Sequence, residues 1–182
     1  SDEENPITPP KPSDEENPIT PPKPSDEENP VTIKGDYQKG LNAFKKGDYK
    51  TAFKEWLLFA DENPKHANVR NLLGHMYHEG KGTPINYKEA LEWFKQAANL
   101  GSSAAQYNLG LMHLYGHEVF KSYINAYEWF KKSANQNYAK AQYQLAKLYF
   151  DGKGVTKDLQ IAKEWAIKSA NQGNKNAKNL LY

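Results

Sequence analysis

The stretch AQYQLAKLYFDGKGVTKDLQIAKEWAIKSA, residues 141–170, decides the fold. Small and apolar residues recur at helical spacing in its first half and again in its second half, which is typical of two amphipathic helices. Gly152-Lys153-Gly154 separates the two halves, and glycine permits the backbone conformations that a turn requires. The stretch therefore predicts a helix, a turn and a second helix.

The same pattern recurs along the chain with a period of 36 residues. Small residues at equivalent positions let two helices approach closely, whereas large aromatic residues fill the space between successive pairs. One helix pair cannot bury its own apolar face, so neighbouring pairs must stack. The equivalent positions hold Trp93, Trp129 and Trp165; Ala90, Ala126 and Ala162; Ala98, Ala134 and Ala170; Gly80, Gly116 and Gly152; Leu73, Leu109 and Leu145; and Gly74, Gly110 and Ala146.

The period predicts an all-α fold: a right-handed α/α superhelix (solenoid) of tandem helix-turn-helix repeats with a disordered N-terminal tail. For one unit, the spacing predicts a first helix over 68–78 and a second over 87–99. The first unit differs, because residues 40–56 (GLNAFKKGDYKTAFKEW) resemble a tetratricopeptide unit with a compact turn. We expect units at about 35–66, 67–102, 103–138 and 139–174, then a terminal helix at 175–182.

The predicted tail is acidic and rich in proline. Residues 1–12 read SDEENPITPPKP, residues 13–24 repeat them exactly, and a third copy begins at Ser25. Such a composition cannot bury enough apolar surface to offset the entropy of ordering. We therefore predict a disordered tail over residues 1–32 and the solenoid over 33–182. The tail could serve as a spacer, or its prolines could dock on an aromatic groove.

Charge is divided unevenly between these two parts. Residues 1–30 hold nine acidic residues and two lysines, a net charge of −7, whereas the remainder holds 22 basic and 13 acidic residues, a net charge of +9. This asymmetry favours attraction of the basic solenoid to an acidic partner or to the acidic tail itself. Self-association could therefore use the acidic tail, or alternatively the terminal helix that ends in Leu180-Leu181-Tyr182.

The repeat resembles the Sel-one-like repeat, a relative of the tetratricopeptide repeat, and the resemblance covers about residues 35–182. It implies an adaptor or scaffold that binds another protein, and it favours an exported bacterial protein over a cytoplasmic one. The middle unit departs from the pattern, because its turn over residues 116–120 lacks the second glycine and His113 replaces a tyrosine. The residues that carry the resemblance are Ala141, Leu145, Tyr149, Gly152, Gly154, Val155, Asp158, Ala162, Trp165 and Ala170.

The resemblance also implies where a partner binds. Tetratricopeptide-like solenoids bind on the concave surface lined by the first helix of each pair, at three positions set by the family glycine. Exposed aromatic side chains on such a surface are typical binding hot spots. Alternatively, half of these residues pack between first helices, with Leu111, Leu114 and Phe150 the first candidates. The twelve positions are Tyr37, Leu41, Phe44, Asn71, His75, His78, Tyr107, Leu111, Leu114, Tyr143, Lys147 and Phe150.

Catalysis and cofactors are not predicted. The absence of cysteine removes disulfides, thiolate metal sites and cysteine nucleophiles. The histidine pairs His75/His78 and His113/His117 lack a carboxylate that would complete a recognised metal motif. Ser102, Ser133 and Ser169 lie at helix ends or turns, and none belongs to a nucleophile motif. We therefore expect no catalytic residue, no metal and no cofactor.

Nucleic-acid binding and a membrane span are also disfavoured. The lysines are spread over every predicted second helix, as expected of a solvated face, rather than gathered into one patch. No apolar run approaches the ~20 residues of a membrane helix.

The sequence thus predicts a protein-binding module with a protein or peptide ligand. One alternative is an immunity protein that neutralises a secreted toxin, which would use the same binding surface. Another is an enzyme acting on peptidoglycan or β-lactams, because cysteine-rich relatives of the repeat are suspected of acting on cell-wall-like substrates. The absence of cysteine and of a nucleophile–base pair argues against that enzyme.

Overall fold

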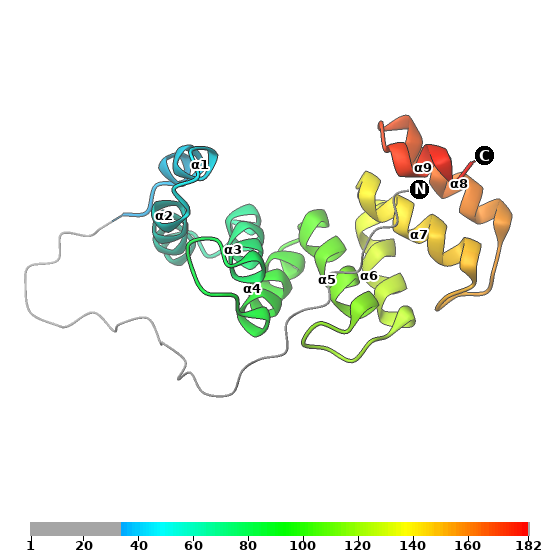
Figure 1. Ribbon diagram of the computed structural model, residues 1–182, viewed down its shortest axis with the longest axis horizontal. Coiled ribbons are helices and arrows are strands. Elements are labelled where there is room, and N and C mark those ends of the chain that lie inside the picture. Colours follow the sequence, from blue (N-terminus) through cyan, green and yellow to red (C-terminus); the bar gives the residue numbers. More distant parts are fainter. Residues whose placement is uncertain (1–33, 182) are drawn as a thin grey trace, which may run out of the picture. The chain divides into compact units, whose positions relative to one another are not determined.

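The computed structural model describes residues 34–181, and this part of the chain consists of helices joined by turns (Figure 1). The helices form successive antiparallel pairs stacked in an α/α solenoid, which confirms the predicted fold class. The predicted tail lies outside the described residues. The helices are α1 (Tyr37–Lys45), α2 (Tyr49–Glu62), α3 (Ala67–Glu79), α4 (Tyr87–Asn99), α5 (Ser103–Tyr115), α6 (Tyr123–Asn135), α7 (Ala139–Asp151), α8 (Leu159–Asn171) and α9 (Lys175–Asn179).

Helix ends follow the repeat. The first helices α3, α5 and α7 each end at a glycine in the left-handed conformation, which glycine adopts without a Cβ penalty. The second helices α4, α6 and α8 begin after Asn86, Ser122 and Asp158, whose side chains accept a hydrogen bond from the first-turn backbone. The predicted second helix over 87–99 therefore has the bounds of α4, and the predicted first helix is one residue shorter at each end than α3.

Within a pair, a glycine of the first helix lies against a large ring of the second. A Cβ added at Gly74 would lie 2.6 Å from the Phe94 ring, and one at Gly110 would overlap the Phe130 ring. In the first unit, Gly40 approaches Trp56, whose indole Nε1 donates to the Tyr37 carbonyl at 3.2 Å. The recurring spacing of small and large residues thus sets how closely the helices of a pair approach.

Tryptophan joins each pair to the one before it. Trp93 packs on the core of α1–α3, Trp129 on the core of α4 and α5, and Trp165 on the core of α6 and α7. These contacts confirm that Trp93, Trp129 and Trp165 fill the space between successive pairs, whereas the Phe94 and Phe130 rings lie within a pair. The buried residues form successive clusters along the repeats, and each tryptophan packs one unit on the cluster before it.

Buried polar side chains reinforce the stacking. Gln142, almost fully buried, donates to the Ala134 carbonyl at the end of the preceding unit and accepts from Gln172 at 2.7 Å. Gln106 makes the same two contacts one unit earlier, with Ala98 and Gln136. A buried amide that is fully paired stabilises one register, because any slip would leave it unsatisfied.

The turn of one unit also rests on the second helix of the unit before it. A Cβ at Gly82 or at Gly154 would overlap the carbonyl oxygen of Tyr49 or Tyr123, respectively. The middle unit holds Glu118 instead, with a positive φ of 55°. The Glu118 side chain cannot pack as closely on the preceding helix as Gly82 and Gly154 do in their units. In the middle unit, the turn instead contacts that helix through His117, whose ring centroid lies 5.8 Å from that of Tyr87.

Candidate functional site

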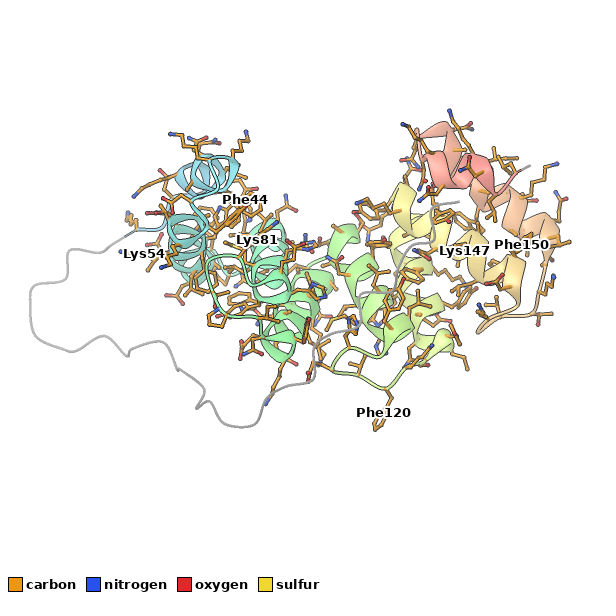
Figure 2. All side chains as sticks on the ribbon, viewed as in Figure 1. Phe44, Lys54, Lys81, Phe120, Lys147 and Phe150 are labelled. Carbon is orange, nitrogen blue, oxygen red and sulfur yellow. The ribbon has the colours of Figure 1, made fainter. Side chains whose placement is uncertain are left out.

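The first-helix face is the surface of α1, α3, α5 and α7 that carries the twelve positions predicted to bind a partner. In α1, Tyr37, Leu41 and Phe44 are half-buried and pack on the core of the first unit. The Phe44 ring meets Tyr49 edge-on at 5.1 Å, and Lys81 Nζ lies 5.4 Å from the centre of the Phe44 ring (Figure 2). This end of the face is therefore aromatic with a cation at its border.

In α3 the face is polar. Asn108, from α5, donates through Nδ2 to Asn71 Oδ1 at 3.0 Å and lies 3.0 Å from His75 Nε2. Because an amide NH₂ only donates, His75 Nε2 must accept, which places the ring proton on Nδ1, 4.0 Å from Glu79 Oε1. The three side chains thus tie α3 to α5 in one arrangement with a neutral histidine.

His78 lies one turn further along α3 in an aromatic cluster. Its ring meets Tyr87 at 5.2 Å and His117 at 6.1 Å between centroids. His117 comes from the turn after α5, beyond the end of that helix, so the pair His113/His117 does not share a helical face. Among residues 34–181, no group of three or more histidine, cysteine or acidic side chains could hold a metal ion.

In α5 the face is apolar. Tyr107, Leu111 and Leu114 are half-buried and pack on a core formed by α6 and α7. They remain partly accessible, so they form the wall of the face and also support the stacking of the next unit. Truncating Tyr107 would therefore lower stability as well as remove surface.

In α7 the face is amphipathic. Lys147 Nζ lies 5.5 Å from the centre of the Tyr143 ring, and Lys157 Nζ lies 5.6 Å from the centre of the Phe150 ring. Figure 2 shows Lys147 and Phe150 on successive turns of this helix. Phe150 is 43% exposed, so its prediction as a first candidate for packing between helices is wrong. Successive helices do not cover it, and a binding role for all twelve positions stays a prediction.

The structure adds residues that the sequence did not single out. Asn108 is buried beside His75, and Lys140 and Lys81 lie close enough to act on that ring electrostatically. The positions equivalent to Asn108 in the neighbouring units hold Leu72 and Gln144. The change from an apolar to a polar residue at this position is the sequence feature that could have identified Asn108. Lys140 gave no signal, because its neighbour on α3 lies 65 residues earlier in the chain.

The serines have structural roles. Ser133 and Ser169 are fully buried and donate to the carbonyls of Ser103 and Ala139, each at 2.7 Å. Ser102 caps α5 by accepting from the Ala105 amide at 3.2 Å. In each of these hydrogen bonds the partner of the serine is a backbone group and not a general base. The backbone partner gives each serine a structural role.

The surroundings of three histidines lower their pKa values. Burial lowers the pKa of His75 below the ordinary 6.5; Glu79 opposes this shift, whereas the positive charges of His78, Lys140 and Lys81 add to it. Burial also lowers the pKa of His78 and His113. His113 has a buried Nδ1 without a hydrogen-bond partner in the described part of the chain.

These shifts predict that stability falls with acidification. The unfolded chain takes up protons at the ordinary pKa, whereas the folded chain resists them until a lower pH. The free energy of unfolding is therefore fully present above about pH 6.5 and declines below it. We expect the melting temperature, followed by circular dichroism at 222 nm, to be lower at pH 5.5 than at pH 7.5 by on the order of a few degrees. The decrease should shrink in His113→Tyr, and an equal or higher value at pH 5.5 would contradict the assignment.

The repeats match a described family. The family model for the Sel1 repeat matches residues 69–102, 103–138 and 139–174. Among solved structures, a Sel1 repeat protein from Oxalobacter formigenes gives a TM-score of 0.74 at 30% identity, over 80% of this chain and 59% of that one. A protective antigen of uropathogenic Escherichia coli, displaying the same repeat fold, gives 0.74 at 32% identity, over 80% of this chain and 32% of that one.

A viral protein is also similar. A sel1-like repeat-containing protein of Acanthamoeba polyphaga mimivirus is 54% identical over 41 residues, which are 22% of this chain and 8% of the viral protein. The chain thus spans at most 59% of the length of these three relatives. Within residues 34–181, each helix is too short or too polar to cross a lipid bilayer.

Proposed function

Since this chain belongs to the Sel1 repeat family, whose members generally act as protein-interaction scaffolds, we propose that it binds a protein or peptide on the first-helix face. One observation carries the proposal: aromatic and aliphatic side chains at the twelve positions remain partly accessible above a buried core. Phe150, at 43% exposure, is the clearest case. Such side chains lose little entropy on binding and bury a large apolar area, which is why they dominate interface energetics.

The face has the parts that an interface needs. Tyr37, Leu41 and Phe44 offer an apolar end, Asn71 and His75 offer hydrogen bonding in the centre, and the α7 end carries aromatic rings beside lysines. Their backbone positions are fixed by rigid, capped helices rather than by loops. A binding surface on rigid elements requires little reorganisation, which lowers the entropic cost of association.

We further propose that this adaptor acts outside the cytoplasm. The similar Escherichia coli protein is a protective antigen present in uropathogenic strains, and the likeness to it supports this proposal. An immunity protein would use the same surface, and identification of the captured partner as a secreted toxin would select that alternative.

Paired variants test the binding surface. In a quantitative pull-down from a lysate of the source cells, Tyr143→Ala with Phe150→Ala should reduce recovery of a specific partner about tenfold, because each truncation of a binding hot spot costs about 1 kcal/mol or more. Ile167→Ala is the matched control, since Ile167 is 40% exposed on the second helix α8. Unchanged recovery with the double variant, or an equal loss with the control, would refute the location.

A further inference from the structure

The first-helix face carries lysines that have no acidic partner within residues 34–181. Lys147 makes no ion pair there; its amine lies 5.5 Å from the Tyr143 ring. Lys140, near the start of α7, also lacks an ion pair in the described part of the chain. Both charges are therefore available to a ligand that approaches α7.

Lysines from two different units lie near enough to His75 to influence its pKa. Lys140 belongs to α7 and His75 belongs to α3, with α5 between them in the chain, yet the charge of Lys140 acts on the pKa of His75. His78 and Lys81 act on the same ring with the same sign. Lys140 and Lys81 thus add positive charge from two units to the surroundings of His75.

The nearby acid is already engaged. Glu79 pairs with Lys81 at 2.7 Å and lies 4.0 Å from His75 Nδ1. It compensates Lys81 at the α3 side, whereas Lys140 and Lys147 at the α7 side have no acidic partner within residues 34–181. Electrostatic complementarity therefore favours a ligand with negative charge beside α7.

The surroundings of Lys147 are apolar. Leu111 and Tyr107 of α5 form a half-buried wall, and Tyr143 and Phe150 flank Lys147 on α7. Two lysines without an ion pair in residues 34–181, one of them beside aromatic rings, suit a peptide in which carboxylates alternate with apolar groups. Nucleic acid would require a denser array of cations, since its affinity depends on neutralising many phosphates.

We propose that the first-helix face binds an acidic peptide of a partner protein, whose carboxylates pair with Lys140 and Lys147 while its apolar side chains lie against Leu111 and Tyr143. This inference rests on the proposed function and specifies the chemistry of the ligand at the same site.

Panning a peptide library tests the inference. A random 12-residue display library is selected on the full-length chain, on Lys140→Glu with Lys147→Glu, and on the control Lys88→Glu with Lys163→Glu, in which two exposed lysines of second helices are reversed. We expect Asp and Glu to be enriched about twofold or more on the wild type and on the control, and not on the first double variant. The dissociation constant of an enriched peptide should rise about tenfold in the first double variant and should stay within twofold in the control.

Other outcomes of this selection would refute the acidic-peptide inference, the proposed function, or both. Enrichment of neutral or basic peptides, no enrichment at all, or tighter binding of a twelve-residue thymidine oligonucleotide would overturn the acidic-peptide inference. If neutral peptides are enriched, and this enrichment disappears in the variant with Tyr143→Ala and Phe150→Ala, the face does bind peptides. In that case only the acidic character of the ligand is refuted. If the partner pull-down is also insensitive to that double variant, the proposed function falls as well.

The acidic segment at the N-terminus requires a parallel selection. In a full-length variant, the nine acidic residues of positions 1–30 are replaced by asparagine and glutamine, which preserves the length of the chain. Stronger acidic enrichment on this variant would support the inference and identify the chain's own segment as a competing ligand. Equal enrichment would support a ligand from a separate protein.

Discussion

Phe130→Ala should lower the free energy of unfolding by about 3–5 kcal/mol, the usual cost of deleting a buried aromatic ring. Phe130 is fully buried between α5, α6 and the next unit. In this background, Gly110→Ala should be stabilising, because the new methyl group enters vacated space and alanine favours the helix. In the wild type the same change should be destabilising by about 1 kcal/mol, because the added Cβ would overlap the Phe130 ring.

The four proteins of this cycle are compared by urea denaturation, with circular dichroism as the signal. The last unit provides an internal reference, since its equivalent positions hold Ala146 and Ala166, both fully buried. The double variant therefore carries the same alanine pair that the last unit has at the equivalent positions. If Gly110→Ala changes stability by the same amount in both backgrounds, the two positions are not coupled and this account of helix spacing is wrong.

Gly154→Ala should cost about 2–4 kcal/mol of unfolding free energy. Gly154 has a φ of +71°, which a residue with a Cβ adopts at a cost of about 1–2 kcal/mol. In addition, the Cβ would overlap the carbonyl oxygen of Tyr123, and backbone atoms of α6 cannot move aside as a flexible side chain can. The turn of the last unit would have to separate from the preceding second helix.

Gly173→Ala separates these two contributions. Gly173 has a φ of +88° but nothing lies within 4 Å of an added Cβ, so only the backbone cost applies. Chemical denaturation should therefore show about twice the loss for Gly154→Ala as for Gly173→Ala. Equal losses would mean that the contact between the turn and Tyr123 contributes nothing to stacking.

The regular parts of the fold were predictable because they depend on local pattern. Capping residues, turn glycines and a 36-residue period are visible in one sequence, and they predicted the bounds of α4. The close approach of Gly110 to the Phe130 ring was not predicted. It is a contact in space between two helices, and periodicity alone does not identify which small residue faces which ring.

The candidate site was predicted less completely. The repeat positions placed twelve side chains on the first helices, all of which keep some exposure. They did not reveal that Lys140 acts on His75 or that Asn108 bonds to Asn71, because both relations join different units. Only the alternative in which Phe150 packs between first helices was wrong, since the burial of that side chain depends on how far its neighbours extend.

Site-specific photocrosslinking in living cells tests the central claim, binding on the first-helix face, most directly. A benzophenone amino acid replaces Phe44, Phe150 or, as the matched site on a second helix, Ile167. We predict a discrete adduct of higher mass from positions 44 and 150 and none from position 167, with the same partner identified by mass spectrometry in both adducts. An adduct from position 167 alone, or equal adducts from all three positions, would contradict the claim.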